Sequence, residues 1–235
     1  MREPVKKSQA LRRAAVLLSG GMDSATAAAW AQAAGFAVSA LSVDYGQRHR
    51  CELDAARAVV SQLGISDHRV VTVDLRAIGG SALTADVAVP KDRETIGGDV
   101  PITYVPARNT VMLALLTGLA EVVGASDLVI GANVQDYSGY PDCRPGFLRA
   151  FAEVATLGTG SGAAGGRFAV HAPLLQLTKA GIVRLASELG VDLGLTLSCY
   201  DPPAPLVHCG RCDACRLRRG GFAAAGVADP STYRT

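Results

Sequence analysis

The sequence predicts an α/β protein with a doubly wound, mostly parallel, five-stranded sheet and a small helical C-terminal module. Three observations lead to this prediction. Short apolar runs alternate with helical stretches that end at glycine, a glycine-rich turn follows the first run, and four cysteines crowd into residues 199–215. Strands and helices that alternate at this spacing are typical of right-handed parallel crossovers in an open sheet.

The individual elements follow from hydrophobic periodicity. Strands are expected at residues 14–18, 36–43, 68–73, 127–130 and 168–175, and helices at 24–34, 50–63, 107–123, 147–157 and 179–189. Residues 14–18 are continuously apolar, as in a strand that is covered on both faces. Residues 76–104 contain many Gly, Pro and charged positions without periodicity, which predicts a long, partly mobile active-site loop.

Composition and charge limit the classes of function. The 235 residues are 49% hydrophobic and 19% charged, with a net charge of +2. This composition is too apolar for disorder, and the near-neutral charge gives no support for nucleic-acid binding. No apolar run approaches the ~20 residues that cross a bilayer. We therefore expect a cytoplasmic protein that binds neither nucleic acid nor membrane.

Three parts are expected along the chain: a flexible basic N-terminus at 1–12, a main domain at 13–196 and a C-terminal module at 197–235. Residues 158–166 are the one low-complexity stretch. They contain a formal G-x-G-x-x-G match, but a dinucleotide fingerprint must follow a strand and open a helix. Here the match follows a predicted helix, so we interpret the stretch as a flexible connector.

The string Ser19-Gly20-Gly21-Met22-Asp23-Ser24 joins the first strand to the first helix. Paired glycines let backbone N–H groups approach phosphate oxygens, and the helix directs its positive end to the same place. Asp23 is expected to hold a bridging magnesium ion or to cap the helix. A plain glycine turn is the alternative. A P-loop that cleaves the γ-phosphate is excluded, because no G-x-x-x-x-G-K-[ST] string is present.

The C-terminal cysteines have the spacing of a metal site: they are Cys199, Cys209, Cys212 and Cys215. Four thiolates can surround one ion tetrahedrally, which favours one structural zinc ion per chain. An iron–sulfur cluster is the main alternative, and disulfides are a weaker one. His208 could replace a thiolate only with strain. Cys143 lies in a polar stretch, but the sequence shows no base that would activate it.

Three further strings fall at the same end of the predicted sheet as the glycine turn: Asp44 to His49, Val105 to Asn109 and Asp136 to Arg144. The last contains two tyrosines, two aspartates and an arginine. Aromatic faces stack on a flat heterocycle, and carboxylates pair with its amino groups. The alternative is that the tyrosines pack and the charges cap helices.

The glycine turn resembles the PP-loop of the ATP-pyrophosphatase superfamily. Together with the three strings and the cysteines, it makes the chain resemble the 7-cyano-7-deazaguanine synthase (QueC) family from about Ala14 to Pro230. The main departure is the stretch 158–166. The resemblance implies a Rossmann-like, adenine nucleotide alpha hydrolase-like fold and a homodimer. It implies an ATP-dependent carbon–nitrogen ligase of queuosine precursor biosynthesis. Its substrates would be 7-carboxy-7-deazaguanine, ammonia and ATP with magnesium, and its intermediates an adenylated carboxylate and an adenylated amide.

The expected site residues follow from the motifs and the resemblance. ATP contacts are expected from Leu18, Ser19, Gly20, Gly21, Met22, Asp23, Ser24, Ala25, Thr26, Tyr45, Gln47 and Arg108. Substrate contacts are expected from Arg48, Asn109, Asp136, Tyr137, Ser138, Tyr140, Asp142 and Arg144. The catalytic residues are expected to be Asp23, Ser24, Arg108 and Lys179, with Lys179 as a second phosphate contact.

Two other functions remain open at this point. Another PP-loop adenylating enzyme, such as a tRNA thiolase, would also use ATP and cysteines. The chain could instead be a nucleotide-binding domain whose zinc ribbon binds nucleic acid. An aromatic content of 5% and the small net charge argue against nucleic-acid binding.

Overall fold

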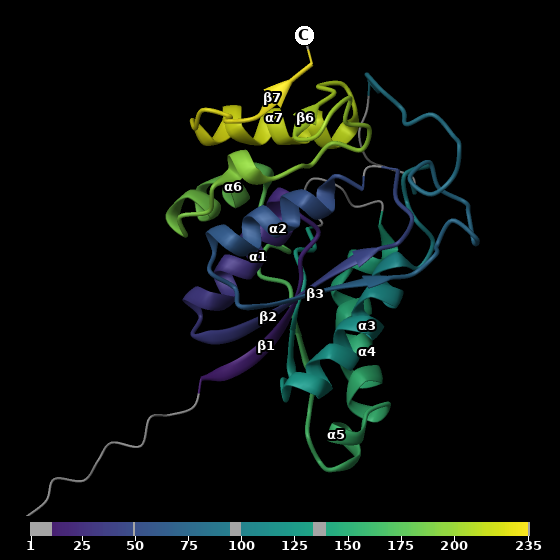
Figure 1. The fold of residues 1–235 in the computed structure, drawn as a ribbon, viewed down its shortest axis with the longest axis vertical. Coiled ribbons are helices and arrows are strands. Elements are labelled where there is room, and N and C mark those ends of the chain that lie inside the picture. The colour runs from purple at the N-terminus through teal and green to yellow at the C-terminus, as the bar shows by residue number, and fades with distance from the viewer. Residues whose placement is uncertain (1–10, 49, 95–99, 134–139, 235) are drawn as a thin grey trace, which may run out of the picture.

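The protein folds around a five-stranded sheet in which every adjacent pair of strands is parallel (Figure 1). The computed structural model describes residues 11–48, 50–94, 100–133 and 140–234. The strands are β1 (Arg12–Leu17), β2 (Phe36–Asp44), β3 (Asp67–Thr72), β4 (Asp127–Val129) and β5 (Ala169–His171). Their order is β3-β2-β1-β4-β5, which confirms the doubly wound sheet. The direction of winding reverses beside β1, and ligands of such sheets bind at that reversal, outside the carboxyl ends of the strands.

Helices cover both faces of the sheet. The α-helices are α1 (Met22–Ala33), α2 (Glu52–Gln62), α3 (Arg108–Val123), α4 (Pro145–Leu157), α5 (Gly160–Ala163), α6 (Lys179–Glu188) and α7 (Asp213–Ala225). Figure 1 shows α3 and α4 on one side of the sheet and α1, α2 and α6 on the other. None of the helices in the described ranges is long and apolar enough to cross a membrane.

The central strand divides the hydrophobic core in two. Ala15 and Leu17 belong to a cluster with α3 and α4, whereas Ala14 and Val16 belong to a cluster with α1 and α6. This alternation follows from the two-residue period of a strand. Residues 14–16 are fully buried, as expected from their continuous apolar character.

Two predicted elements differ from the structure. The strand expected at 168–175 stops at His171, because Pro173 lacks an N–H and a turn begins there. The stretch 158–166, expected to be a flexible connector, contains the short helix α5. The Thr159 hydroxyl caps this turn by accepting a hydrogen bond from the Gly162 backbone N–H at 3.1 Å.

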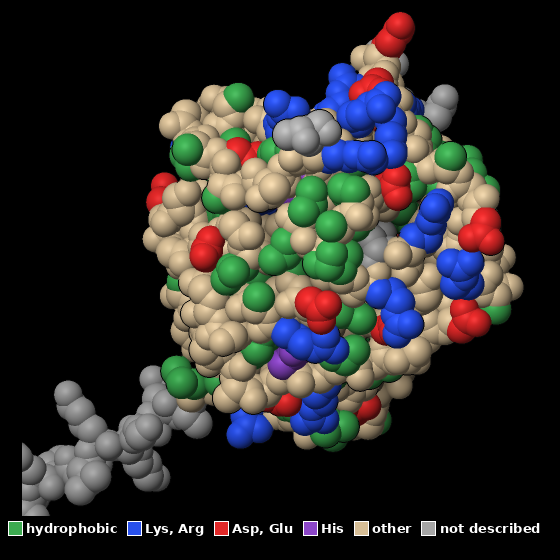
Figure 2. Space-filling view, turned by 45° about the horizontal axis from the view of Figure 1, so that its top comes forward, with side chains coloured by type: hydrophobic (Ala, Val, Ile, Leu, Met, Phe, Trp, Pro, Cys, Tyr) green, Lys and Arg blue, Asp and Glu red, His purple; other side chains and the backbone are tan. Residues whose placement is uncertain are grey.

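The long loop at 76–104 contains no helix or strand in its described part, as predicted. It is fastened to the C-terminal part of the chain. Lys91 forms an antiparallel bridge with Cys212, and the Asp92 N–H donates to the Arg211 carbonyl at 3.0 Å. Ion pairs join Lys91 to Asp201, Asp92 to Arg211 and Arg93 to Asp213. Figure 2 shows basic and acidic side chains gathered at the top of the molecule.

The C-terminal part adds α7, the 3-10 helix η2 (Leu193–Leu195) and a two-stranded parallel sheet of β6 (Val207–His208) and β7 (Thr232–Tyr233). Its four clustered cysteines belong to the same core cluster as β2 and α3. This part therefore packs against the carboxyl end of the main sheet. The division of the chain at residue 197 stays a prediction.

Candidate active site

The turn between β1 and α1 is shaped by two glycines. Gly20 has a φ of 85°, and a Cβ there would lie 2.2 Å from the Glu52 carbonyl oxygen. Only glycine therefore fits without moving α2. Gly21 is the N-cap of α1, and no side chain caps the helix. The positive end of α1 is thus available for an anion.

Two serines fix the conformation of the turn. The Ser24 hydroxyl donates to the Gly21 carbonyl at 3.0 Å and accepts from the Ser19 N–H at 3.1 Å. The Ser19 hydroxyl lies 3.1 Å from that of Ser24 and is exposed to the cavity. Ser24 therefore holds the turn together, whereas Ser19 can reach a ligand.

Asp23 and Lys179 meet across two helices. Their Oδ2 and Nζ atoms lie 2.5 Å apart, and both residues line the cavity. The Oδ1 atom of Asp23 is buried and has no hydrogen-bond partner within the described ranges. An unpartnered carboxylate oxygen beside an anion site fits a hard divalent cation. A Cβ on Gly131, which follows β4, would lie 2.8 Å from the Ser24 backbone nitrogen, so Gly131 lets β4 approach the turn.

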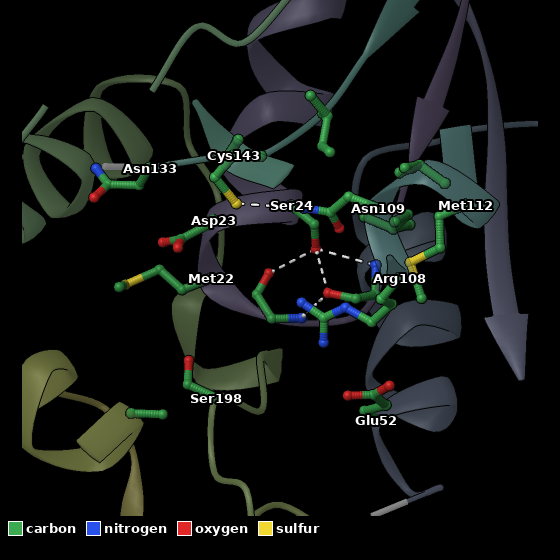
Figure 3. Close-up of a pocket in the computed structure, with 18 of the residues that line it drawn as sticks. Met22, Asp23, Ser24, Glu52, Arg108, Asn109, Met112, Asn133, Cys143 and Ser198 are labelled. Carbon is green, nitrogen blue, oxygen red and sulfur yellow. Dashed lines mark hydrogen bonds between the residues drawn. The ribbon is translucent and has the colours of Figure 1, made fainter. Parts of the chain in front are cut away.

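The turn opens into a cavity of about 280 Å³. Leu17, Leu41, Val43, Leu83 and Met112 give it apolar walls. In Figure 3, Arg108, Met112 and Glu52 lie on one side of the turn, Asn133 and Ser198 lie on the other, and Cys143 and Asn109 lie beside Ser24. The cavity is therefore apolar in part and has polar groups on both sides of the turn.

Arg108 is the cationic group at the start of α3. The preceding Ala107 has a left-handed backbone with a φ of 54°, and its N–H donates to the Tyr104 hydroxyl at 3.1 Å. The Arg108 guanidinium lies 5.9 Å from the centre of the Tyr45 ring. Burial alone would lower the pKa of Arg108, but its tyrosine neighbours raise it above the ordinary value. The side chain therefore stays charged.

Asn109 and Asp142 form a pair beside the cavity. Asp142 accepts from the Asn109 N–H at 3.0 Å, and the Asn109 side-chain amide donates to the Asp142 carbonyl and to the Cys143 sulfur. Burial, assisted by Asp142, raises the pKa of Cys143 to about 11. The Cys143 thiol is therefore neutral at physiological pH.

Several expected contacts do not line the cavity. Gln47 is buried and bonds to the Tyr45 N–H and the Glu52 carboxylate. Arg48 donates to the Val87 carbonyl, and Asp142 is occupied by Asn109. Gly20, Ala25, Thr26 and Arg144 also lie outside the lining, the first three because they are buried behind the turn. Asp136, Tyr137 and Ser138 lie outside the described residues.

The structure also adds residues that sequence reasoning missed: Glu52, Gly131, Asn133, Ser198 and Tyr200. Gly131 and Asn133 follow β4, where the carboxyl end of a strand is a usable signal. Ser198 and Tyr200 flank Cys199. The sequence pattern indicates only a metal site in this stretch, so it does not predict that either residue lines the cavity. Glu52 lies in the first turn of α2, and no pattern distinguishes it from a surface residue.

The four C-terminal cysteines converge. Their sulfur atoms all lie within 4.8 Å of one another, all four residues are buried, and none forms a disulfide. The sulfurs of Cys209 and Cys215 are 3.9 Å apart, close to the roughly 3.8 Å edge of a tetrahedron with metal–sulfur bonds of about 2.3 Å. Hydrogen bonds from Cys199 and Cys215 lower the pKa of Cys212 far below that of an ordinary thiol. The cluster therefore fits a tetrahedral metal ion. His208 is not part of it: its Nε2 atom accepts from the Ser198 N–H.

Known proteins resemble the chain over nearly all of its length. The family model described as "Queuosine biosynthesis protein QueC" matches residues 13–226. A protein named 7-cyano-7-deazaguanine synthase from Myxococcus xanthus (strain DK1622) is 57% identical over 225 residues, 95% of this chain and 98% of that protein. Another protein of that name, from Xanthomonas campestris pv. campestris (strain B100), is 61% identical over 223 residues, with the same coverage of 95% and 98%.

A solved structure supports the fold alone. The "predicted subunit of tRNA methyltransferase" from Methanocaldococcus jannaschii DSM has a TM-score of 0.50 and 20% identity, and the alignment covers 76% of this chain and 75% of that one.

Proposed function

The chain belongs to the QueC family of queuosine biosynthesis proteins, and from that premise we propose that it is a 7-cyano-7-deazaguanine synthase. The proposal rests on relatives of that name that are 57% and 61% identical over almost the whole chain. The cavity supports it, because the phosphate-binding turn, Lys179 and the arginine at the start of α3 all face one space.

The reaction joins 7-carboxy-7-deazaguanine and ammonia at the expense of ATP. A carboxylate resists attack by ammonia because its oxygen leaves poorly. Transfer of AMP from ATP releases pyrophosphate and gives an acyl adenylate; ammonia then displaces AMP and leaves the amide. A second adenylation then takes place, this time on the amide oxygen. Loss of AMP and a proton from this second adenylate leaves the nitrile. We propose these two adenylated intermediates for this chain.

The chain's own groups suit the stabilisation of a departing pyrophosphate. We propose that the N-terminal N–H groups of α1 and the Lys179 ammonium hold its negative oxygens. The unpartnered Oδ1 of Asp23 would hold magnesium, which would supply further neutralising charge. Ser19 supplies a hydroxyl donor, and Ser24 keeps the turn in shape.

We propose that the cysteine cluster holds one structural zinc ion. Four sulfur ligands fill its coordination shell, so the site would be closed to substrates. The main alternative, an iron–sulfur cluster, would absorb visible light. Purified protein should therefore be colourless and contain one zinc per chain by elemental analysis. A brown protein that contains iron would contradict the assignment.

Further properties are proposed from the family resemblance. We propose that the protein uses free ammonia as its nitrogen source and that it is a homodimer in the cytoplasm. We also propose that it acts without binding nucleic acid. Size-exclusion chromatography with light scattering tests the dimer, and replacement of ammonium by glutamine in the assay tests the nitrogen source. Gel shift at ~150 mM salt tests nucleic-acid binding.

One experiment tests the function directly. The protein is incubated with ATP, magnesium, ammonium and 7-carboxy-7-deazaguanine, and the products are identified by mass spectrometry. We expect the nitrile, together with AMP and pyrophosphate. Asp23→Ala should abolish product formation, whereas Asp54→Ala on the exposed face of α2 should not. ADP as the sole nucleotide product would exclude adenylation.

A further inference from the structure

Three tyrosines from separate parts of the chain surround Arg108. They are Tyr45 after β2, Tyr140 before the 3-10 helix η1 (Pro141–Cys143), and Tyr200 beside Cys199. All of them line the cavity with Arg108. The Tyr200 hydroxyl lies beside that of Tyr140, which in turn is 3.2 Å from the Thr103 hydroxyl. Three segments outside α3 thus meet at one guanidinium.

This group is complementary to an anion. In the part of the chain that the structure describes, no carboxylate forms an ion pair with Arg108. A half-buried guanidinium without a counter-charge is costly unless a ligand provides one. Its planar donors match a carboxylate, and a neighbouring tyrosine hydroxyl can donate a further hydrogen bond to the same ligand. The tyrosine rings offer flat faces to a heterocycle.

Tyr200 reaches this group from the cysteine cluster. It follows Cys199 directly in the chain. The next N–H, that of Asp201, donates to the Cys199 sulfur at 3.4 Å. A sulfur of the cluster that fits a metal ion therefore also holds the backbone next to a residue in the cavity wall. The C-terminal part is thus connected to the cavity wall by a hydrogen bond to a cysteine sulfur as well as by packing.

We propose that Tyr200 is a substrate-binding residue that, with Arg108 and Tyr140, holds the carboxylate of the deazaguanine, and that the cysteine cluster keeps it in place. This inference rests on the proposed function. It assigns the C-terminal part a direct share in substrate recognition, beyond stabilising the fold. The Tyr200 hydroxyl contacts the carboxylate group that is later activated, whereas the phosphate-binding turn contacts ATP.

The test removes one hydroxyl. Tyr200→Phe should raise the KM for 7-carboxy-7-deazaguanine roughly 10-fold, as expected for a lost hydrogen bond to a charged group. The KM for ATP should change less than about twofold. Tyr233→Phe is the matched control: it removes a phenol in the same part of the chain that bonds to Asp229 and does not line the cavity. Neither KM should change in this variant.

Two readouts separate this role from a structural one. Metal content per chain should be the same in Tyr200→Phe and the unchanged protein. Calorimetry without ATP should show that the unchanged protein prefers 7-carboxy-7-deazaguanine to 7-deazaguanine, and that Tyr200→Phe loses most of this preference. A rise in the KM for ATP alone, an unchanged preference, or loss of metal would overturn the inference. Failure of the unchanged protein to make nitrile would instead overturn the proposed function.

Discussion

Lys179 shows how far a single residue's role can be inferred from its neighbours. Its ammonium pairs with Asp23 beside the turn at residues 19–24, although the two residues lie on different helices. The Thr178 hydroxyl caps α6 by accepting from the Gly181 N–H, which places Lys179 at the first helical position. The side chain therefore projects from a fixed point into the cavity.

Removal of this ammonium should slow adenylation. We expect Lys179→Ala to lower kcat/KM for ATP roughly 100-fold, the usual effect of losing one preorganised charge-stabilising group. Release of pyrophosphate measures the rate. Arg57→Ala, which removes an exposed cation that pairs with Asp54 on α2, should leave the rate within twofold. A Lys179→Ala enzyme with more than a third of the original rate would refute the phosphate role.

The Cys143 thiol should react slowly and at unusually high pH. Its pKa of about 11 means that the thiolate fraction rises only as pH approaches 11, so the thiol is protonated at pH 8. At pH 8 we expect alkylation by iodoacetamide to be roughly 10-fold slower than for an ordinary thiol, even though a more basic thiolate is more nucleophilic. Peptide mass spectrometry follows the rate, and the same cysteine in urea is the reference. Equal alkylation rates in the folded and the unfolded protein would show that burial does not control the reactivity of Cys143.

Residue roles were harder to predict than residue locations. The string at residues 19–24 predicts a tight turn between strand and helix because its paired glycines suit a special backbone geometry, and the structure contains that turn. Its binding of phosphate stays a prediction. Gln47 and Asp142 were expected to contact ligands because they are polar and lie near the site, yet both are used to hold backbone groups. Sequence spacing specifies which segments meet, but it does not specify which way a polar side chain points.

At the scale of elements, prediction worked where a long apolar or alanine-rich stretch ended at a glycine. The helices α1, α3 and α6 begin and end within two residues of their predicted limits. Prediction failed at β5, because the strand ends before Pro173. It also failed at α5, because the low-complexity sequence gives no helical pattern although Thr159 caps a helical turn there. Both failures have local causes: a missing N–H in one case and a single side-chain cap in the other.

The short helix α5 depends on one glycine. A Cβ on Gly162 would lie 1.6 Å from the Thr156 carbonyl oxygen. Gly162→Ala should therefore lower the free energy of unfolding by about 1–3 kcal/mol, the usual cost of overpacking. Gly160→Ala is the matched control, because its Cβ would meet only the Glu121 side chain at 3.6 Å. Urea unfolding measures both, and equal midpoints would show that α5 adapts freely.

At the scale of the whole molecule, Arg218 joins the C-terminal segments. This fully buried side chain donates to the Leu193 carbonyl and to the hydroxyls of Thr196, Ser198 and Ser231, and it lies 3.6 Å from Asp229. One guanidinium thus holds together η2, the segment before Cys199 and the tail of the chain. Composition and sequence pattern do not predict this buried role of Arg218, because arginine side chains are mostly exposed in folded proteins.

Replacement of Arg218 should loosen all of these segments together. We expect Arg218→Leu to lower the free energy of unfolding by about 3 kcal/mol, since it leaves the Leu193 carbonyl and the Thr196 hydroxyl without their buried donor and removes the charge that faces Asp229. Its exposed neighbour Arg219, which lies over the Tyr233 ring, provides the comparison. Arg219→Leu should cost less than about 1 kcal/mol. Similar losses in the two variants by urea unfolding would contradict the role of Arg218.

The direct connection from Cys199 to Tyr200 has a thermodynamic consequence. If metal on the cysteines tightens the binding of the deazaguanine by some factor, linkage requires the deazaguanine to tighten the binding of metal by the same factor. At equilibrium with a chelator, substrate should then raise the fraction of protein that keeps its metal ion, and ATP alone should do so less. The supply of the metal ion and the supply of the deazaguanine would thus each affect how firmly the protein binds the other.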